Sequence, residues 1–494
     1  MHFEGHPGPG FHIAFCGIFY IILNEKSEHR NACERGTKVA EKEIRARVQS
    51  FLQKNGMDHE SMDFMKECRI FLQDMQKGLD GDEDCLDMLP TYIPMTEEIP
   101  SNEPVIVMDA GGTNFRIAVV CFNKDKEPVI DDFENYPMPG AGEEVDRDEF
   151  FHTAAEYLKP VIHKSNKIGF CFSYPTDILP NGDGRLIRFS KEIRVQNMIG
   201  QPVGAGILKA LESEGVTERK RIVLLNDTVA TLLGGKAAFP RMHYDSFVGY
   251  ILGTGTNTSY IEEGANIGKL REECGSYDTM VINMESGAYA KSPSGKIDRE
   301  FDATTVNPGE STFEKKISGA YLGGLSYTLL RDAGEEGLFS KTLSNALRGI
   351  PTLSTKEADD FLHAPYGDNP LAGFCSPDPE EGRTDRTTLY FLIDSLIERA
   401  AKLSAVNLSA VIMKTGKGKD PARPVCITAD GSTFYKTKDF PGRVERYMKT
   451  WLNGKLGQYH TFVEVKNANL TGSAIAALAK LSSQPGWKTR IPGV

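Results

Sequence analysis

The feature that most constrains the fold is a strand–turn–strand unit that occurs twice along the chain. In each copy a β-type run ends in a Gly-Thr turn followed by Asn, and a second β-type run begins soon afterwards. The first copy covers 105–122 and the second covers 247–262. Glycine lets backbone amides approach an anion without interference from a Cβ atom, and each threonine adds a hydroxyl donor. One glycine turn between strands is usually only a hairpin, but the repeat predicts two halves that hold a nucleotide polyphosphate between them.

Length and composition narrow the class of protein. A chain of 494 residues exceeds what one hydrophobic core usually organises, so we expect two or more domains. The formal net charge of -11 argues against nucleic acid or an anionic membrane as a main partner. The nine cysteines are an odd number and include no C-x-x-C pair. This pattern favours reduced thiols in a cytoplasmic protein over a disulfide framework.

The N-terminus differs from the rest of the chain. Residues 11–23 form an apolar run that follows a Gly/Pro-rich leader without Lys or Arg. The run is too short to span a bilayer as a helix, and it lacks the basic region and cleavage site of a secretory signal. We therefore interpret residues 1–37 as an extension that the sequence specifies poorly, with a membrane anchor as the less favoured alternative.

From residue 38 onward the apolar periodicity alternates between strand and helix patterns. Strands are predicted at 104–109, 115–122, 129–136, 167–173, 221–225, 246–252, 258–263, 425–428 and 461–465. Helices are predicted at 38–55, 59–78, 147–165, 229–238, 312–332, 386–413, 439–452 and 472–482. Two β-rich halves with appended helices predict an internally duplicated α/β fold.

An ordered set of motifs resembles that of the hexokinases. The segments are 88–91, 107–116, 169–175, 186–191, 226–231, 253–257, 282–289, 307–315, 429–432 and 471–474. Each motif alone is modest evidence, but the order and approximate spacing make the set specific, and the resemblance covers roughly 60–482. No zinc-type Cys/His spacing occurs, which disfavours the bacterial repressor-related glucokinases.

The resemblance implies a two-lobed actin-like fold of the ribonuclease H-like class, with duplicated domains and a cleft between the lobes. On this pattern 38–96 form the helical part of the large lobe and 97–225 form the small lobe. Residues 226–469 then complete the large lobe, and 470–494 form a C-terminal helix that returns to the small lobe. Closure of the lobes over the sugar would limit transfer of phosphate to water.

The chain departs from the family pattern at several positions. Leu is common where Ala110 lies, Trp where Ser286 lies, Gln where Ser311 lies, and Thr where Ser190 lies. Ser190 keeps a hydroxyl group, whereas the loss of Trp and Gln reshapes the sugar pocket and leaves the preferred hexose open. The final helix also lacks the Gly-Ser-Gly-Lys that is frequent in the family.

Phosphoryl transfer to a sugar hydroxyl requires a carboxylate that takes the proton from the hydroxyl group. The resemblance assigns this role to Asp227, although an Asp before a helix is more often an N-cap. Asp109, beside the first glycine turn, is assigned to the Mg²⁺ shell, because an acid next to phosphates needs a cation between them. Lys191 would supply positive charge near the transferring group, and Arg116 could do similar work.

Polar side chains at the matched positions would recognise the sugar and the nucleotide. The sugar side consists of Ser173, Ser190, Lys191, Asn226, Asp227, Asn257, Glu285 and Glu314. The nucleotide side consists of Asp109, Gly111, Gly112, Thr113, Asn114, Arg116, Thr254, Gly431, Ser432, Gly472 and Ser473. The last pair is expected at a helix start, where amides can point at a phosphate.

These features predict an ATP:hexose 6-phosphotransferase of carbohydrate metabolism that uses Mg²⁺ and ATP, acts in glycolysis, and exists as a monomer or homodimer. Glucose is the leading substrate, with mannose and fructose as alternatives. A sugar-sensing regulator that keeps the fold and the pocket without useful catalysis is a second hypothesis. A different polyol or acetate-type kinase of the same superfamily is a third.

Overall fold

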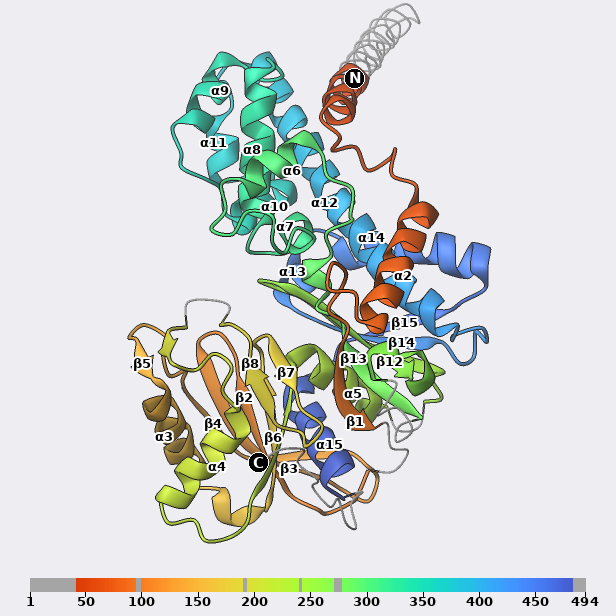
Figure 1. Ribbon diagram of the computed structural model, residues 1–494. Helices are drawn as coiled ribbons and strands as arrows, with labels where there is room; N and C mark the ends of the chain where they lie inside the picture. The colour runs from red at the N-terminus through yellow and green to blue at the C-terminus, as the bar shows by residue number, and fades with distance from the viewer. Residues whose placement is uncertain (1–40, 95–98, 190–192, 240–241, 271–277, 483–494) are drawn as a thin grey trace, which may run out of the picture.

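Two β-sheets with the same strand plan organise the chain (Figure 1). The computed structural model describes residues 41–94, 99–189, 193–239, 242–270 and 278–482. The strands of the first sheet are β2 (Val105–Ala110), β3 (Asn114–Phe122), β4 (Pro128–Pro137), β6 (Lys167–Phe172) and β10 (Arg221–Leu225). Those of the second are β1 (Leu89–Pro94), β11 (Ser246–Leu252), β12 (Thr256–Glu263), β13 (Thr279–Asn283), β14 (Val425–Asp430) and β15 (His460–Val463).

The pairing of the strands shows the duplication directly. The first sheet has the order β10-β6-β2-β3-β4, and the second has the order β15-β14-β11-β12-β13-β1. In each sheet a central strand, β2 or β11, forms an antiparallel hairpin with the next strand and pairs in parallel on its other side. The two Gly-Thr turns therefore lie at equivalent ends of the two sheets. The predicted duplicated, two-lobed α/β fold is confirmed.

Helices cover both faces of the five-stranded sheet. The helices α3 (Arg147–Leu158) and α4 (Val203–Ser213) cover the outer face, and α15 (Ala468–Ser482) packs against β2 and β6 on the other face. Strand β2 shows the alternation that this arrangement requires. Ile106 and Met108 join the core under α3 and α4, whereas Val105 and Val107 join the core that contains α15. Because both faces are covered, β2 is buried over its whole length.

The helix α5 (Asp227–Ala238) packs against β11 and β14 of the six-stranded sheet, and it also packs against α15. Two helices thus lie between the sheets and link the two lobes (Figure 1). Their backbones approach very closely. A Cβ atom on Gly472 would lie 1.9 Å from the carbonyl oxygen of Ala230, and one on Gly234 would lie 2.6 Å from that of Ala468. Only glycine fits at such a contact.

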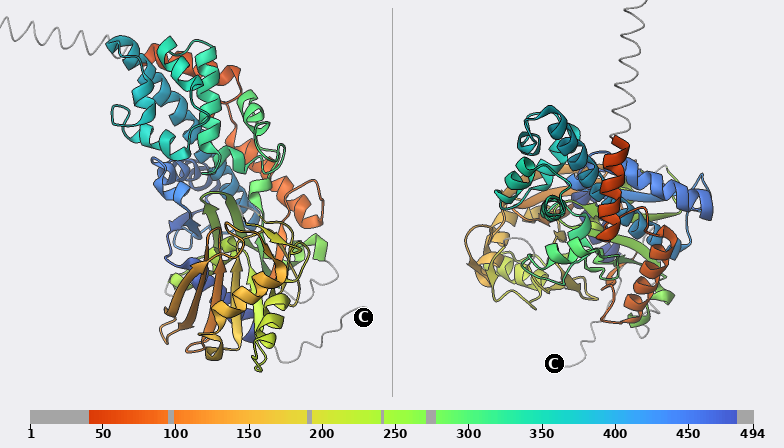
Figure 2. Two further views of the ribbon diagram at one scale, coloured as in Figure 1. Left: turned by 90° about the vertical axis from the view of Figure 1, so that its left-hand side faces the viewer. Right: turned by 90° about the horizontal axis from the view of Figure 1, so that it is seen from above.

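The remaining helices build the large lobe. Residues 41–54 are helical, and α2 (Phe64–Asp80) packs against the 37-residue helix α12 (Pro379–Thr415). A group of helices extends the lobe away from the five-stranded sheet, so that the molecule is elongated (Figure 2). They are α6 (Lys296–Asp302), α7 (Glu314–Ile317), α8 (Leu322–Glu335), α9 (Lys341–Arg348), α10 (Thr355–His363) and α11 (Pro370–Phe374). The helices α13 (Ser432–Lys436) and α14 (Phe440–Met448) lie between β14 and β15 in the sequence.

Several predicted elements need correction. The helix predicted at 312–332 is two helices, α7 and α8, and the break between them lets the amide of Gly319 donate to the carbonyl oxygen of Gly253 at 2.8 Å. The helix predicted at 147–165 ends at Leu158, and the one predicted at 472–482 begins at Ala468. No strand is predicted at the matched segment 88–91, but its residues from Leu89 onward belong to β1, which pairs with β13. The elements that were not predicted are strand β13, helices α4, α6, α9, α10, α11 and α13, and the short pairs β5–β9 (Val145–Asp146, Val195–Gln196) and β7–β8 (Thr176–Ile178, Gly184–Leu186).

Across the residues that the structure describes, no helix has both the length and the apolar character needed to cross a bilayer. The apolar run at 11–23 lies outside the described residues.

A buried lysine lies where α15 packs against β1. Lys480 of α15 is 6% exposed, and its Nζ donates to the carbonyl oxygen of Tyr92 at 2.9 Å. The same Nζ lies 5.4 Å from the centre of the Tyr92 ring. Burial lowers the pKa of Lys480 to about 7. The ammonium form is therefore disfavoured in the folded protein.

This burial predicts a pH-dependent stability. Between pH 7 and 10 the unfolded chain keeps the Lys480 proton while the folded chain loses it, so stability rises with pH over this window. We expect the contribution to be about 1.4 kcal/mol per pH unit, and Lys480→Met should remove it. Urea unfolding of both proteins at several pH values measures the difference. An equal pH slope in the two proteins would contradict the prediction.

Candidate active site

Hydrogen bonds fix the tips of both Gly-Thr hairpins. In the first hairpin the amide of Gly111 donates to the carbonyl oxygen of Asn114 at 3.0 Å, and the hydroxyl of Tyr174 donates to the carbonyl oxygen of Gly111 at 2.5 Å. In the second, the amide of Thr256 donates to Oε2 of Glu314 at 2.9 Å. A Cβ atom on Gly255 would lie 2.5 Å from the same oxygen. Glycine is therefore needed there for the carboxylate to approach.

A single cavity of about 660 Å³ brings the two hairpins together. Nine of the predicted residues line it: Asp109, Gly111, Gly112, Thr113, Asn114, Arg116, Ser173, Asp227 and Thr254. Residues of both lobes contribute, because the first hairpin belongs to the five-stranded sheet, and Thr254 follows β11 of the six-stranded sheet. Ala141, Gly142, Ile193 and Asn469 complete the lining and were not predicted.

The start of α5 directs a carboxylate into this cavity. Asn226 is the N-cap of α5, and its Oδ1 accepts the amide of Thr228 at 2.8 Å. The capping role that we considered for Asp227 therefore belongs to Asn226. Oδ1 of Asp227 accepts a hydrogen bond from the hydroxyl of Thr228 at 3.3 Å, and Asp227 lines the cavity. A carboxylate in this position can accept a proton from a bound hydroxyl group.

Asp109 is a second carboxylate in the same cavity. It is 4% exposed, and its Oδ2 lies 3.2 Å from Nη1 of Arg116. Burial raises the pKa of Asp109, the charge of Arg116 lowers it, and the charge of Asp227 raises it further. Asp430 lies at the end of β14. Burial and the charge of Asp227 raise the pKa of Asp430, whereas the hydrogen bond from the Gly431 amide lowers it. The acidic groups therefore make this end of the cavity suitable for a cation.

A network of amides and a carboxylate lies next to Asp227. Nδ2 of Asn257 lies 3.3 Å from Oδ1 of Asn226, 2.8 Å from Oδ1 of Asn283 and 3.4 Å from Oε1 of Glu285. Nδ2 of Asn283 donates to the same Glu285 oxygen at 2.8 Å. Burial raises the pKa of Glu285 to about 7. The sequence analysis missed Asn283, although its place in the matched segment 282–289, two residues before Glu285, was a signal.

The other predicted site residues that the structure describes lie outside the cavity lining. Glu314 contacts the second hairpin, and Gly431, at φ +117°, packs so closely that a Cβ atom would lie 2.2 Å from the carbonyl oxygen of Leu252. Ser432 begins α13. Ser190 and Lys191 fall outside the described residues.

Gly472 and Ser473 are not at a helix start, as we had predicted, but in the second turn of α15, where amides bond to the preceding turn. The Ser473 hydroxyl donates to the carbonyl oxygen of Asn469 at 2.7 Å. Helix packing accounts for the burial of both residues, and their contact with the nucleotide stays a prediction.

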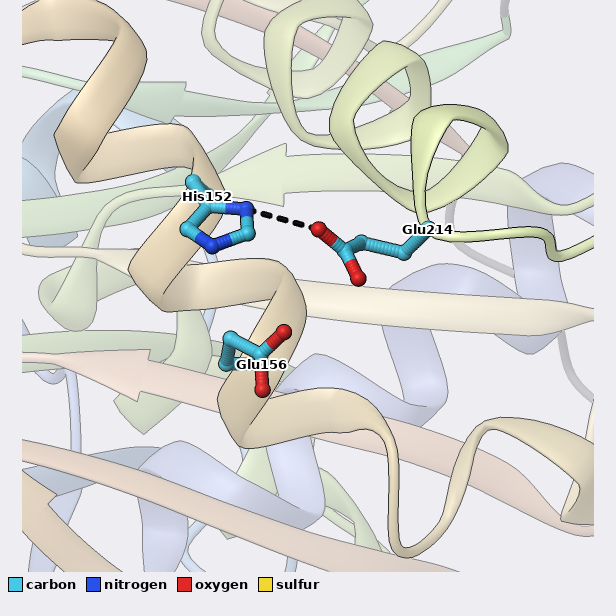
Figure 3. A group of neighbouring side chains, drawn as sticks. All are labelled: His152, Glu156 and Glu214. Carbon is cyan, nitrogen blue, oxygen red and sulfur yellow. Dashed lines mark ion pairs between the residues drawn. The ribbon is translucent and has the colours of Figure 1, made fainter.

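A separate cluster of charged side chains joins α3 to α4 (Figure 3). Nδ1 of His152 lies 2.8 Å from Oε1 of Glu214, and Glu156 is one helical turn from His152. The ligand atoms of these three residues lie within 4.8 Å of one another. Lys159 contacts both carboxylates and offsets their charge, at 2.7 Å from Oε2 of Glu214. We therefore interpret the cluster as a group of ion pairs between the two helices.

Comparison with known proteins identifies the family. Two family models described as Hexokinase match residues 47–237 and 247–479. Hexokinase-1 of Spinacia oleracea is 30% identical over 426 residues, which cover 81% of this chain and 83% of the relative. Hexokinase-1 of Arabidopsis thaliana is 30% identical over 430 residues, which cover 82% and 84%.

A solved structure shares the fold. The hexokinase of Schistosoma mansoni, complexed with glucose, aligns with a TM-score of 0.71 at 22% identity, over 89% of this chain and 99% of that one. The sequence relatives, the two family models and this shared fold agree. The chain therefore belongs to the hexokinase family, the enzymes that phosphorylate sugars with ATP.

Proposed function

We propose that this hexokinase transfers the γ-phosphoryl group of ATP to the 6-hydroxyl of glucose, with Asp227 as the general base. The observation that carries the proposal is the single cavity, which is lined by the first Gly-Thr hairpin, by Thr254 of the second hairpin and by Asp227. Phosphoryl transfer needs a held polyphosphate, compensating charge and a poised hydroxyl group, and it needs little else from the protein.

On the nucleotide side, the backbone amide of Gly112 and the hydroxyls of Thr113 and Thr254 would bind phosphate oxygens. The amide of Gly111 is bonded to Asn114, and Gly111 would instead let a phosphate approach the turn without a Cβ atom in the way. Arg116, at the edge of the same cavity, would neutralise charge, as would Lys191. Gly431 and Ser432 follow β14 and would lie on the adenosine side. Asn114 lies beside Thr113 and completes the tip of the first Gly-Thr hairpin.

The residues present fit a magnesium ion. Asp109 offers a buried carboxylate beside the first hairpin. Burial and the charge of Asp227 raise its pKa even though Arg116 lies beside it, so a further cation would stabilise the ionised form. Asp109 would hold Mg²⁺ directly or through water. When bound, the ion supplies charge that balances the phosphate oxygens.

On the sugar side, the amide network would bind hydroxyl groups that both donate and accept. The proposed contacts are Ser173, Ser190, Lys191, Asn226, Asp227, Asn257, Glu285 and Glu314. A pocket of this kind discriminates against a sugar that lacks a hydroxyl, because buried polar atoms would remain unpaired. Glucose is the leading hexose because the family resemblance favours it.

A coupled assay for ADP release over glucose, mannose, fructose, glycerol and acetate tests the proposal. We expect hexose-dependent turnover with glucose preferred. Binding of glucose without ADP release would instead support a sugar-sensing regulator. Turnover of glycerol or acetate in preference to any hexose would contradict the proposed substrate class.

The raised pKa of Glu285 predicts how sugar affinity depends on pH. Only the ionised carboxylate accepts hydrogen bonds with all its lone pairs, and half of the molecules carry a proton on Glu285 near pH 7. We expect the glucose Kd to rise as pH falls below 7, by up to about tenfold per unit, and to be constant above pH 8. Calorimetric titration with glucose measures this. Glu285→Gln should bind glucose more weakly, with a flat profile between pH 5 and 8, and an unchanged slope would contradict the assignment.

A further inference from the structure

A chain of buried hydrogen bonds connects the long helix α12 to the amide network of the site. Asn407 of α12, Thr258 of β12 and Ser286 after β13 are all fully buried. Nδ2 of Asn407 donates to Oγ1 of Thr258 at 2.7 Å, and this oxygen lies 3.0 Å from Oγ of Ser286. The three side chains therefore join a helix, a strand and a turn that are far apart in the sequence.

The two hydroxyl residues in this chain also hold Asn257 through their backbones. Oδ1 of Asn257 accepts the amide of Thr258 at 2.6 Å and the amide of Ser286 at 3.3 Å. With its oxygen held by two amides, the Asn257 side chain must direct Nδ2 toward Asn226, Asn283 and Glu285. The Thr258–Ser286 contact fixes the distance between the two segments that supply these amides.

Ser286 suits this position because its hydroxyl can either donate to Oγ1 of Thr258 or accept from it. Oδ1 of Asn407 is buried, and it has no hydrogen-bond partner among the residues that the structure describes. A buried acceptor without a donor costs stability, so this Asn is poorly explained by packing alone.

We propose that Asn407 is a positioning residue for the sugar site, acting through Thr258 and Ser286 on the orientation of Asn257 and, with it, Glu285. The proposal rests on the proposed function, because it assumes that Asn257 and Glu285 contact the sugar. It assigns Asn407 no contact with substrate. Its role is to keep the β12 segment and the turn after β13 at the separation that the Asn257 amide requires.

Asn407→Leu tests the proposal, because leucine has a similar volume and removes both the bond to Thr258 and the unpaired oxygen. We expect the KM and the calorimetric Kd for glucose to rise about fivefold to tenfold, with the KM for ATP and kcat within twofold of the unaltered enzyme. The melting temperature should not fall. Ser409→Ala is the matched control, since it removes from the same helix a buried hydroxyl that has no partner in the described part of the chain. It should leave every constant unchanged.

A double-mutant cycle separates positioning from a general structural effect. In the Asn257→Ala background, Asn407→Leu should change the glucose KM by less than twofold, because the group that it positions is gone. An additive increase, or an equal rise in the KM for ATP, would overturn the proposal. If the unaltered enzyme phosphorylates no hexose, the proposed function fails instead. If the enzyme is active but Asn407→Leu leaves the glucose KM unchanged, the positioning role of Asn407 is wrong and the proposed function still holds.

Discussion

Asp227→Asn should reduce kcat by roughly 10²- to 10⁴-fold while glucose still binds within a few-fold of its original affinity. The substitution keeps the shape of the side chain but removes the group that can accept a proton from the sugar hydroxyl. The helix should be unaffected, because Asn226 and not Asp227 caps α5. The loss would therefore fall on the chemical step rather than on folding or sugar binding.

The measurement combines the coupled assay for kcat with calorimetric titration of glucose. Asp148→Asn is the matched control: it is another acid in the first turn of a helix, α3, but it is exposed and lies outside the cavity lining. We expect it to retain most of the activity. An Asp227→Asn enzyme with full turnover would exclude Asp227 as the base, and a variant that binds no glucose would show that the residue acts mainly in binding.

Local sequence predicts the strands around the site well. The bounds of β10 and β11 agree to the residue with those predicted, because each apolar run of strand-forming residues ends at a polar or glycine turn. The glycine turns also indicated most of the cavity lining. In both cases the signal lies within a few neighbouring residues, so it does not depend on the rest of the chain.

Features set by distant contacts were harder to predict. Strand β1 contains two prolines and is typical of a loop, yet it pairs with β13 nearly 200 residues later. The continuous helix predicted at 312–332 is interrupted because Gly319 and Ala320 bond to the second hairpin. The chain of buried hydrogen bonds from Asn407 to Asn257 likewise joins positions 150 residues apart, and no local sequence pattern predicts it.

Neighbouring polar residues pose a related problem. Both Asn226 and Asp227 are suitable N-caps, and sequence alone could not decide which of them fills the role. The structure assigns the cap to Asn226 through its bond to Thr228, and this leaves the acid for the cavity. Ser190 and Lys191, whose roles depend on the family resemblance, remain predictions.

Gly472→Ala should destabilise the protein by about 3 kcal/mol, although alanine is intrinsically the better helix former by about 1 kcal/mol. The added Cβ atom would lie 1.9 Å from the carbonyl oxygen of Ala230, so α15 would have to move away from α5. A backbone atom cannot change rotamer to relieve this contact. Since α5 carries Asp227 at its first residue, the displacement should also lower kcat.

Urea unfolding of Gly472→Ala and of a matched control, Gly373→Ala in α11, measures the effect. A Cβ atom on Gly373 would meet nothing within 4 Å, so this substitution should be neutral or stabilise by about 0.5–1 kcal/mol. Opposite signs at two helical glycines would show that the contact between α5 and α15, rather than helix propensity, determines the result. A Gly472→Ala enzyme of normal stability with a raised KM for ATP would instead favour the nucleotide contact first expected from the sequence, since a phosphate site there would lose affinity without loss of the helix packing.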